Sequence, residues 1–162
     1  MRALISVYDK TGLLPFARGL VDLGFELVAS GGTATALEDG GISVTRVEEV
    51  TGFPELLEGR VKTLHPRIHA GILARRDRDD DVTALAEHGI EPFDLVCVNL
   101  YQFELVADRA GLADDEVIEM IDVGGPSMLR AAAKNYSHVV PVCRHEDYDG
   151  VLHELRARGG ET

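Results

Sequence analysis

The stretch FDLVCVNLY, residues 93–101, constrains the fold of this chain more than any other. Residues 95–98 (LVCV) are apolar in succession, and Asn99 is the first polar side chain after them. Because neighbouring residues of a strand point to opposite faces of a sheet, such a run is apolar on both faces and must be covered on both. We therefore expect an inner strand of a parallel sheet that lies between layers of helices.

Strand-like and helix-like patterns alternate along the rest of the chain. The expected strands are residues 3–8, 25–30, 43–50, 93–101 and 138–143. The expected helices are residues 11–23, 33–40, 82–88, 114–121, 127–135 and 146–158. The charged run RRDRDDD, residues 75–81, is expected to be an exposed loop, and residues 51–74 allow no assignment. This alternation predicts an α/β fold, a single domain over residues 1–162 with a mainly parallel central sheet and helices on both faces.

Net charge and hydropathy argue against two classes of binding partner, nucleic acid and membranes. The formal net charge of −12 argues against nucleic acid, whose phosphates require a basic face. No stretch approaches the roughly 20 apolar residues of a membrane-spanning helix, so we expect no membrane partner. The first residues run directly into a strand pattern rather than a signal peptide, which predicts a cytoplasmic protein. Cys97 and Cys143 lie in apolar runs and are expected to be buried, reduced thiols.

Two segments that follow expected strands have the residue types of an anion site. SGGT, residues 30–33, is a Gly-rich turn that opens a helix, where backbone N–H groups, the helix dipole and the hydroxyls of Ser30 and Thr33 can meet an anion. By itself this turn is more typical of an ordinary strand-to-helix connection. Lys10, in SVYDKTG, follows the neighbouring strand and can reach the same crevice, and lysine binds phosphate as a point charge. Together the two segments predict a phosphate site at the carboxyl edge of the sheet.

Lys62, in GRVKTLHP, stands out because the chain otherwise uses arginine. Of 16 basic residues only Lys10, Lys62 and Lys134 are lysines, which leaves 13 arginines. Arginine keeps its proton in proteins, whereas burial and neighbouring charges can tune a lysine amine to exchange one. A lysine two residues from Arg60 therefore indicates a geometry or a pKa that arginine does not supply. Three lysines are a small sample, so chance is the competing explanation.

Two further segments place polar side chains where a pocket should open. NLYQF ends the most apolar strand with Asn99 and Tyr101, although a half-buried tyrosine anchored by its hydroxyl is a common structural feature. In IDVGGPSMLRAAAKN, Asp122 precedes a Gly-Gly-Pro turn, and a helix runs from there toward Lys134. Structure alone would make Asp122 a turn acid and Lys134 a favourable charge near the C-terminus of the helix. Twelve residues separate the two, so only the tertiary fold can bring them together.

His65 and His69 are four residues apart, a spacing that on a helix would allow metal binding. Pro66 between them argues against a helix there, and no HExxH pattern occurs. We therefore expect no metal site.

Taken together, SVYDKTG, SGGTA, TGFPE, GRVKTLHPRIHAGIL, NLYQF and IDVGGPSMLRAAAKN resemble the IMP cyclohydrolase domain of the bifunctional purine-biosynthesis enzymes that also carry AICAR transformylase. The resemblance runs nearly end to end and implies a methylglyoxal-synthase-like fold, in agreement with the alternation above. Position 102 is Gln where the family usually has Pro. We expect this chain to lack the folate-dependent transformylase half. The sequence leaves open whether that half was excised, is a separate chain or was lost.

The resemblance implies that the chain closes the second purine ring, converting the ribotide formyl-AICAR into IMP with loss of water and with neither a metal nor an organic cofactor. Lys62, Tyr101, Asp122 and Lys134 match the catalytic positions of the family. We expect Asp122 and Lys134 to transfer protons together, and Lys62 and Tyr101 to position ring substituents and stabilise developing charge. The expected nucleotide- and phosphate-binding residues are Lys10, Ser30, Gly32, Thr33, Arg60, Thr63, Asn99 and Gly124. Family members form homodimers, which predicts a homodimer here.

Two other functions share this fold. One is methylglyoxal synthase, a lyase that eliminates phosphate from dihydroxyacetone phosphate. The other is a regulatory domain of carbamoyl phosphate synthetase, which binds ligands without catalysis. Both would use the phosphate turn, but neither accounts for GRVKTLHP or RAAAKN. Phosphate release from the triose phosphate would indicate the first, and nucleotide binding without turnover the second.

Overall fold

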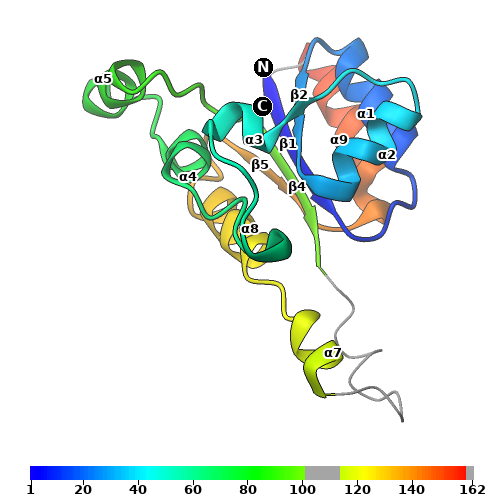
Figure 1. Cartoon of the computed structure of the whole chain (residues 1–162). Helices are drawn as coiled ribbons and strands as arrows, with labels where there is room; N and C mark the ends of the chain where they lie inside the picture. The colour runs from blue at the N-terminus through cyan, green and yellow to red at the C-terminus, as the bar shows by residue number, and fades with distance from the viewer. Residues whose placement is uncertain (101–113, 160–162) are drawn as a thin grey trace.

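The computed structural model describes residues 1–100 and 114–159. In this part of the chain the centre is a five-stranded sheet, parallel throughout, with the order β3-β2-β1-β4-β5 (Figure 1). The strands are β1 (Arg2–Val7), β2 (Glu26–Ala29), β3 (Thr45–Arg46), β4 (Leu95–Asn99) and β5 (Val140–Val142). The predicted α/β fold around a parallel sheet is therefore confirmed.

β4 is an inner strand, as its sequence predicts. It lies between β1 and β5, and the residues of its apolar run are at most 1% exposed. Leu95 and Cys97 belong to the hydrophobic core on one face of the sheet, and Val96 and Val98 to the core on the other. The period of two along a strand thus divides one apolar run between two cores.

Helices cover both faces of the sheet (Figure 1). One face is covered by α1 (Leu13–Asp22), α2 (Gly31–Asp39) and α9 (Tyr148–Ala157), which contribute Phe16, Leu37 and Leu152 to its core. The other face is covered by α3 (Val47–Thr51), α4 (Pro66–Leu73) and α8 (Gly124–Lys134), which contribute Val47, Ile68 and Met128.

The remaining elements lie at the periphery. These are α5 (Asp79–Glu87), α7 (Asp114–Glu119) and the short 3-10 helices η1 (Leu57–Gly59) and η2 (His145–Asp147). α7 buries none of its residues and projects away from the sheet (Figure 1). Within the described ranges, no helix has the length and apolar character needed to cross a membrane.

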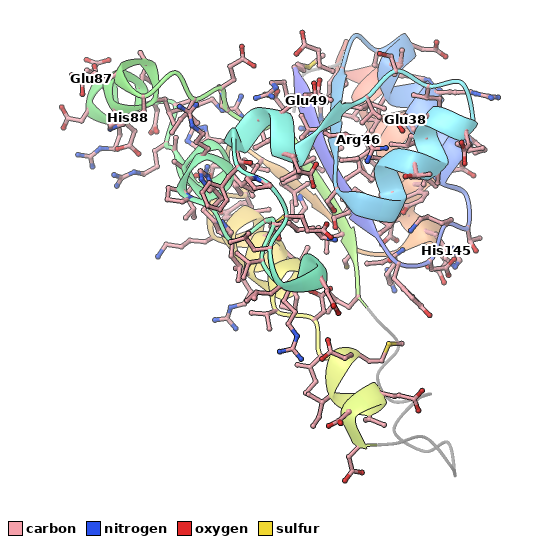
Figure 2. The ribbon with its side chains drawn as sticks, viewed as in Figure 1. Glu38, Arg46, Glu49, Glu87, His88 and His145 are labelled. Atoms are coloured by element: carbon pink, nitrogen blue, oxygen red, sulfur yellow. The ribbon has the colours of Figure 1, made fainter. Side chains whose placement is uncertain are left out.

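Residues 43–50, expected to form one strand, divide into a strand and a helix. Only Thr45–Arg46 pair with the sheet, and α3 follows directly. The Glu49 side chain accepts a hydrogen bond from Arg46 N–H at 2.9 Å, which satisfies a backbone donor at the start of a helix. The Arg46 guanidinium in turn donates to Glu38 of α2 (Figure 2). The alternation in SVTRVEEV favours a strand, but this local cap favours the helix.

Other helices begin earlier than their patterns predict. α2 begins at Gly31 and α8 at Gly124, so the Gly-rich segments are first turns of helices rather than separate turns. α5 begins at Asp79, which makes the prediction of a loop over residues 75–81 wrong for its last three residues. Three aspartates in the first turn of α5 interact favourably with the helix dipole, so a charge run that resembles a loop supports a helix.

The two cysteines differ in exposure. Cys97 is buried in β4, whereas Cys143 is exposed, and both are free thiols. The prediction of two buried thiols is therefore wrong for Cys143. The reason is that β5 ends at Val142, so the residue after it leaves the core.

Candidate active site

A cavity of about 630 Å³ opens beyond the carboxyl ends of β1 and β4, where parallel α/β sheets bind ligands. Its volume lies in the usual range for small-molecule sites. Its walls come from segments far apart in the sequence: the ends of β1 and β4, the start of α2, residues 58–63 and residues 118–125.

Ten of the twelve predicted site residues line this cavity. They are Lys10, Ser30, Gly32, Thr33, Arg60, Lys62, Thr63, Asn99, Asp122 and Gly124. Tyr101 lies outside the described residues. Lys134 is exposed at the last position of α8 and does not line the cavity. Ten residues of helix separate it from Gly124, about 15 Å at the α-helical rise, so a single chain does not bring Lys134 to Asp122.

One end of the cavity concentrates positive charge. It adjoins the N-terminus of α2, whose first N–H groups have no side-chain cap. The Lys62 ammonium packs against this helix start, because its Nζ lies 3.0 Å from the position that a Cβ would take at Gly31. The partial positive charge of a helix N-terminus repels an ammonium, and an anion bound beside both would remove that repulsion.

Lys10 adds a second ammonium to the same end. Burial lowers the pKa of Lys10 below the ordinary lysine value, Asp9 opposes this effect, and the charge of Lys62 lowers the pKa further. The Lys10 ammonium donates to the carbonyl oxygens of Val7 and Tyr8. The arrangement therefore places two ammonium groups close enough to interact at one end of the cavity.

The hydroxyl groups of this end also serve the fold. Thr33 Oγ1 accepts from Val7 N–H and donates to the Val7 carbonyl, each at 3.0 Å, and so joins α2 to the end of β1. Its proton is committed within the protein, contrary to the expectation that it donates to an anion. Ser30 Oγ lies 2.9 Å from Ser6 Oγ, and both serines line the cavity. Ser6 is the first residue of the SVYDKTG segment, from which only Lys10 was predicted to contact a ligand.

Asn99 ends β4 where a pocket opens, as predicted, but its amide holds the loop after β1. Its Oδ1 accepts from the N–H groups of Tyr8 at 2.6 Å and Asp9 at 3.1 Å, and its Nδ2 donates to the Asp9 carbonyl at 2.8 Å. Asn99 therefore positions the segment that carries Lys10.

The start of α8 forms another part of the wall. Asp122 Oδ1 accepts from Gly125 N–H at 2.8 Å, so the carboxylate is held by the first turn of the helix. A Cβ on Gly125 would collide with the other oxygen of Asp122, and a Cβ on Gly124 would collide with Thr63 Oγ1. The two glycines thus allow the Asp122 carboxylate and the buried Thr63 to approach the helix backbone closely.

Two cationic residues of the wall have carboxylate partners. Lys62 Nζ lies 3.6 Å from Glu55, and Arg60 pairs with Glu119 of α7, with its Nε at 3.2 Å from the carboxylate. Hydrogen bonding from Arg60 lowers the pKa of the Glu119 carboxyl group. Because the Arg60 and Glu119 side chains are 60% and 55% exposed, their pair contributes little stability. It does join the residue after η1 to α7, and both of its members line the cavity.

An apolar rim was not predicted. Ile118, Ile121 and Val123 line the cavity although each side chain is more than half exposed. The available signal was their position in DDEVIEMIDV, where Ile118 lies in the short acidic helix α7, which buries none of its residues, and Ile121 and Val123 follow that helix.

Pro66 is the first residue of α4 and His69 lies within that helix, so the argument against a helix between His65 and His69 is wrong. Proline is well suited to the first helical position because its missing N–H has no partner there. His65 caps α4, its Nδ1 accepting from Arg67 N–H at 3.1 Å. In residues 1–100 and 114–159, no group of three His, Cys, Asp or Glu side chains is arranged to hold a metal ion.

Residues 12–127 match the family model of the MGS-like domain. The chain belongs to the MGS-like family. This MGS-like domain is 56% identical over 161 residues to the bifunctional purine biosynthesis protein PurH of Listeria monocytogenes, covering 99% of the chain. It is 63% identical over 151 residues, 93% of the chain, to PurH of Lacticaseibacillus casei. It spans only 32% and 30% of the lengths of these two relatives.

The crystal structure of ForH is 44% identical to the MGS-like domain and superposes with a TM-score of 0.89. The match covers 99% of this chain and 80% of that one. Both the expected fold and the resemblance to the bifunctional purine-biosynthesis enzymes are confirmed.

Proposed function

We propose that this MGS-like domain is an IMP cyclohydrolase, which closes formyl-AICAR to IMP with loss of water. The observation that carries the proposal is one cavity with two chemically distinct ends. Lys10, Lys62 and the N-terminus of α2 form the proposed anion site, and Asp122 lies at the start of α8 in the same cavity. The identity with PurH proteins supports purine biosynthesis as the pathway.

In the proposed complex the ribotide phosphate binds between Lys10 and Lys62, with backbone N–H groups of α2 as further donors. The imidazole ring then extends toward Asp122 and Gly124. The cavity is large enough for a nucleotide monophosphate, and its apolar rim, with Ile121 and Val123, would cover the ring faces.

Ring closure joins two groups of one molecule, so the main task of the protein is orientation. The carboxamide nitrogen forms a bond to the formyl carbon and loses one proton, and the formamide nitrogen loses the second as its double bond to that carbon forms. The formyl oxygen gains charge, takes up protons and leaves as water. Asp122 is the proposed proton acceptor, and the Lys62 ammonium is the proposed donor to the oxygen. These are acid–base steps without a change of oxidation state, so the proposal invokes neither a metal nor an organic cofactor.

Lys134 requires a second copy of the chain to take part. On the outer face of α8, Arg130 and Lys134 are exposed one turn apart and have no partner in the described part of the chain. Tyr136 beside them is 75% exposed. α7 has the complementary character, with three acids in its first turn and Ile118 exposed. We infer a two-fold homodimer in which α7 of each copy contacts the end of α8 of the other.

Such a dimer would set the two α8 helices antiparallel, which brings the C-terminal end of one toward the N-terminal end of the other. Lys134 of the second copy would then approach Asp122, and the pair expected from the sequence would form between chains. A covalently linked or separate transformylase domain, as in the longer relatives, is compatible with this arrangement.

The test is to mix the purified chain with formyl-AICAR and follow IMP by ultraviolet absorbance. We expect turnover that Asp122→Asn abolishes and that the matched exposed variant Asp149→Asn retains. A wild-type chain without turnover contradicts the proposal. Phosphate release from dihydroxyacetone phosphate, or tight nucleotide binding without IMP formation, would then favour the lyase or the regulatory alternative.

A further inference from the structure

Two of the segments that line the cavity lie at the N-terminal ends of two helices that pack against each other. Lys62 and Thr63 lie just before α4, and Asp122 and Gly124 lie at the start of α8. α4 and α8 share one hydrophobic core and lie side by side (Figure 1). The separation of these two segments therefore depends on how the first turn of α8 is held against α4.

A hydrogen-bonded link joins these helices behind the cavity. His69 of α4 places its Nε2 3.2 Å from Ser127 Oγ, and Ser127 Oγ donates to the Gly124 carbonyl at 2.8 Å. A carbonyl oxygen can only accept, so the serine proton is committed to Gly124. The Ser127 oxygen can then accept from His69 Nε2–H, and the other ring nitrogen, Nδ1, lies 3.4 Å from the His65 carbonyl oxygen at the start of α4.

The link ends on the groups that form the wall. Gly124 contacts Thr63, and the next residue, Gly125, donates its N–H to Asp122. His69 and Ser127 are themselves half-buried and do not line the cavity. They are therefore placed to act on a bound ligand only through the first turn of α8.

We propose that His69 and Ser127 are positioning residues that set the distance between Lys62 and Asp122. This inference rests on the proposed cyclohydrolase function of the cavity. Without the link, the first turn of α8 is free to move away from Thr63 and to carry Asp122 with it. Intramolecular ring closure is sensitive to such alignment, and a displacement of about 1 Å can lower a rate about 100-fold.

The experiment compares two substitutions at each position. His69→Leu removes the donor, whereas His69→Gln keeps an N–H donor near the position of Nε2. Ser127→Ala removes the hydroxyl, whereas Ser127→Thr keeps it. We expect kcat to fall about tenfold to 100-fold in His69→Leu and Ser127→Ala, with KM changed much less, and the conservative variants to keep kcat within about threefold of wild type.

Coupling between the two residues gives a second readout. Because both act through one link, the double variant His69→Leu/Ser127→Ala should be no slower than the slower single variant. Losses that multiply would contradict a shared link. The matched control is His153→Leu, an exposed histidine of α9 on the other side of the sheet, which should keep the wild-type kcat.

A measurement without turnover separates this inference from the proposed function. The backbone amide resonances of Gly124 and Gly125 should shift in His69→Leu and return toward wild type in His69→Gln, whatever reaction the cavity performs. Suppose that the wild-type chain forms IMP and that His69→Leu has the same kcat and the same Gly124 and Gly125 amide resonances as the wild type. This result would overturn the positioning role and would support the cyclohydrolase function. If His69→Leu does not fold, the Ser127→Ala and Ser127→Thr pair decides the question by the same two readouts.

Discussion

At the scale of single residues, Lys62 illustrates why a chain rich in arginine keeps a lysine. Its ammonium packs against Gly31 at the start of α2 and also lies near Glu55 and Lys10. A compact ammonium fits this space, whereas a planar guanidinium is larger and keeps its proton. The structure thus supplies a steric reason for lysine in addition to the chemical one.

We expect Lys62→Arg to fold normally and to lose most turnover, by at least about 100-fold in kcat, because general acid–base steps contribute on that scale. The measurement is kcat for IMP formation, with circular dichroism to confirm the fold. Arg156→Lys, on the exposed side of α9, is the matched exchange and should keep the wild-type rate. A Lys62→Arg variant with the wild-type rate would refute the tuned-amine argument.

The two cysteines should differ in their reactivity toward a thiol reagent. Burial raises the pKa of the Cys97 thiol to about 12 and outweighs the opposing effect of its hydrogen bond with Tyr148. The thiolate is the reactive form, and a thiol remains protonated at any pH well below its pKa. Because pH 8 is well below the raised pKa of Cys97, this residue should be inert to a thiol reagent at pH 8. We expect the native chain to react at Cys143 alone and the unfolded chain at both cysteines. Rapid modification of Cys97 in the folded chain, read by mass spectrometry, would show that β4 is not buried as described.

At the scale of elements, α8 is tied to α4 at both ends. His69 and Ser127 join the start of α8 to α4. At the other end the buried Asn135 donates through Nδ2 to the carbonyls of Ile72 at 2.8 Å and Ala74 at 2.9 Å, where α4 ends. Asn135 therefore satisfies orphan carbonyl groups of one helix from the cap of another, which gives RAAAKN a structural role beside any catalytic one.

Asn135→Ala should destabilise the fold by about 1–3 kcal/mol, because it leaves buried carbonyl groups without a donor. Urea unfolding followed by circular dichroism measures the change. Ser137→Ala, two residues away and exposed, should stay within about 0.5 kcal/mol of wild type. An equal, small effect of both variants would mean that water replaces the Asn135 amide at no cost.

At the scale of the whole molecule, Lys134 and Asp122 are separated along α8, so the proposed part of Lys134 in the reaction requires the proposed dimer. If each site takes Asp122 from one copy and Lys134 from the other, a dimer of one Asp122→Asn chain and one Lys134→Ala chain contains one intact site. Exchange of equal amounts of the two variants should therefore restore about a quarter of the wild-type activity, although each variant alone is inactive.

The control for this prediction is a mixture of Asp122→Asn with Lys62→Ala. Both residues line the same cavity of one chain, so no exchange of subunits creates an intact site. Recovery in the first mixture and none in the control is the expected pair of results. No recovery in either mixture, with subunit exchange demonstrated, would remove Lys134 from the catalytic set or place it at the site in some other way.

Local patterns were enough to predict the α/β class, the inner strand β4 and a helix that follows the Gly-rich segment after β2. The period of two, the continuous apolar run and the Gly-rich start of a helix are properties of neighbouring residues. The errors at α3, α5 and Cys143 are local as well. They arise where a side-chain cap, a helix dipole or the end of a strand outweighs the hydrophobic pattern.

The sequence by itself determined the fold class and ten of the residues that line the cavity, because strand ends and helix starts of a parallel sheet meet at one edge. Only the tertiary structure decided what each side chain does there. It committed the hydroxyl of Thr33 and the amide of Asn99 to the backbone, and it separated Lys134 from Asp122 by the length of a helix. Hydrogen-bond partners and distances between segments far apart in the chain depend on how whole elements pack, and no pattern of neighbouring residues encodes them.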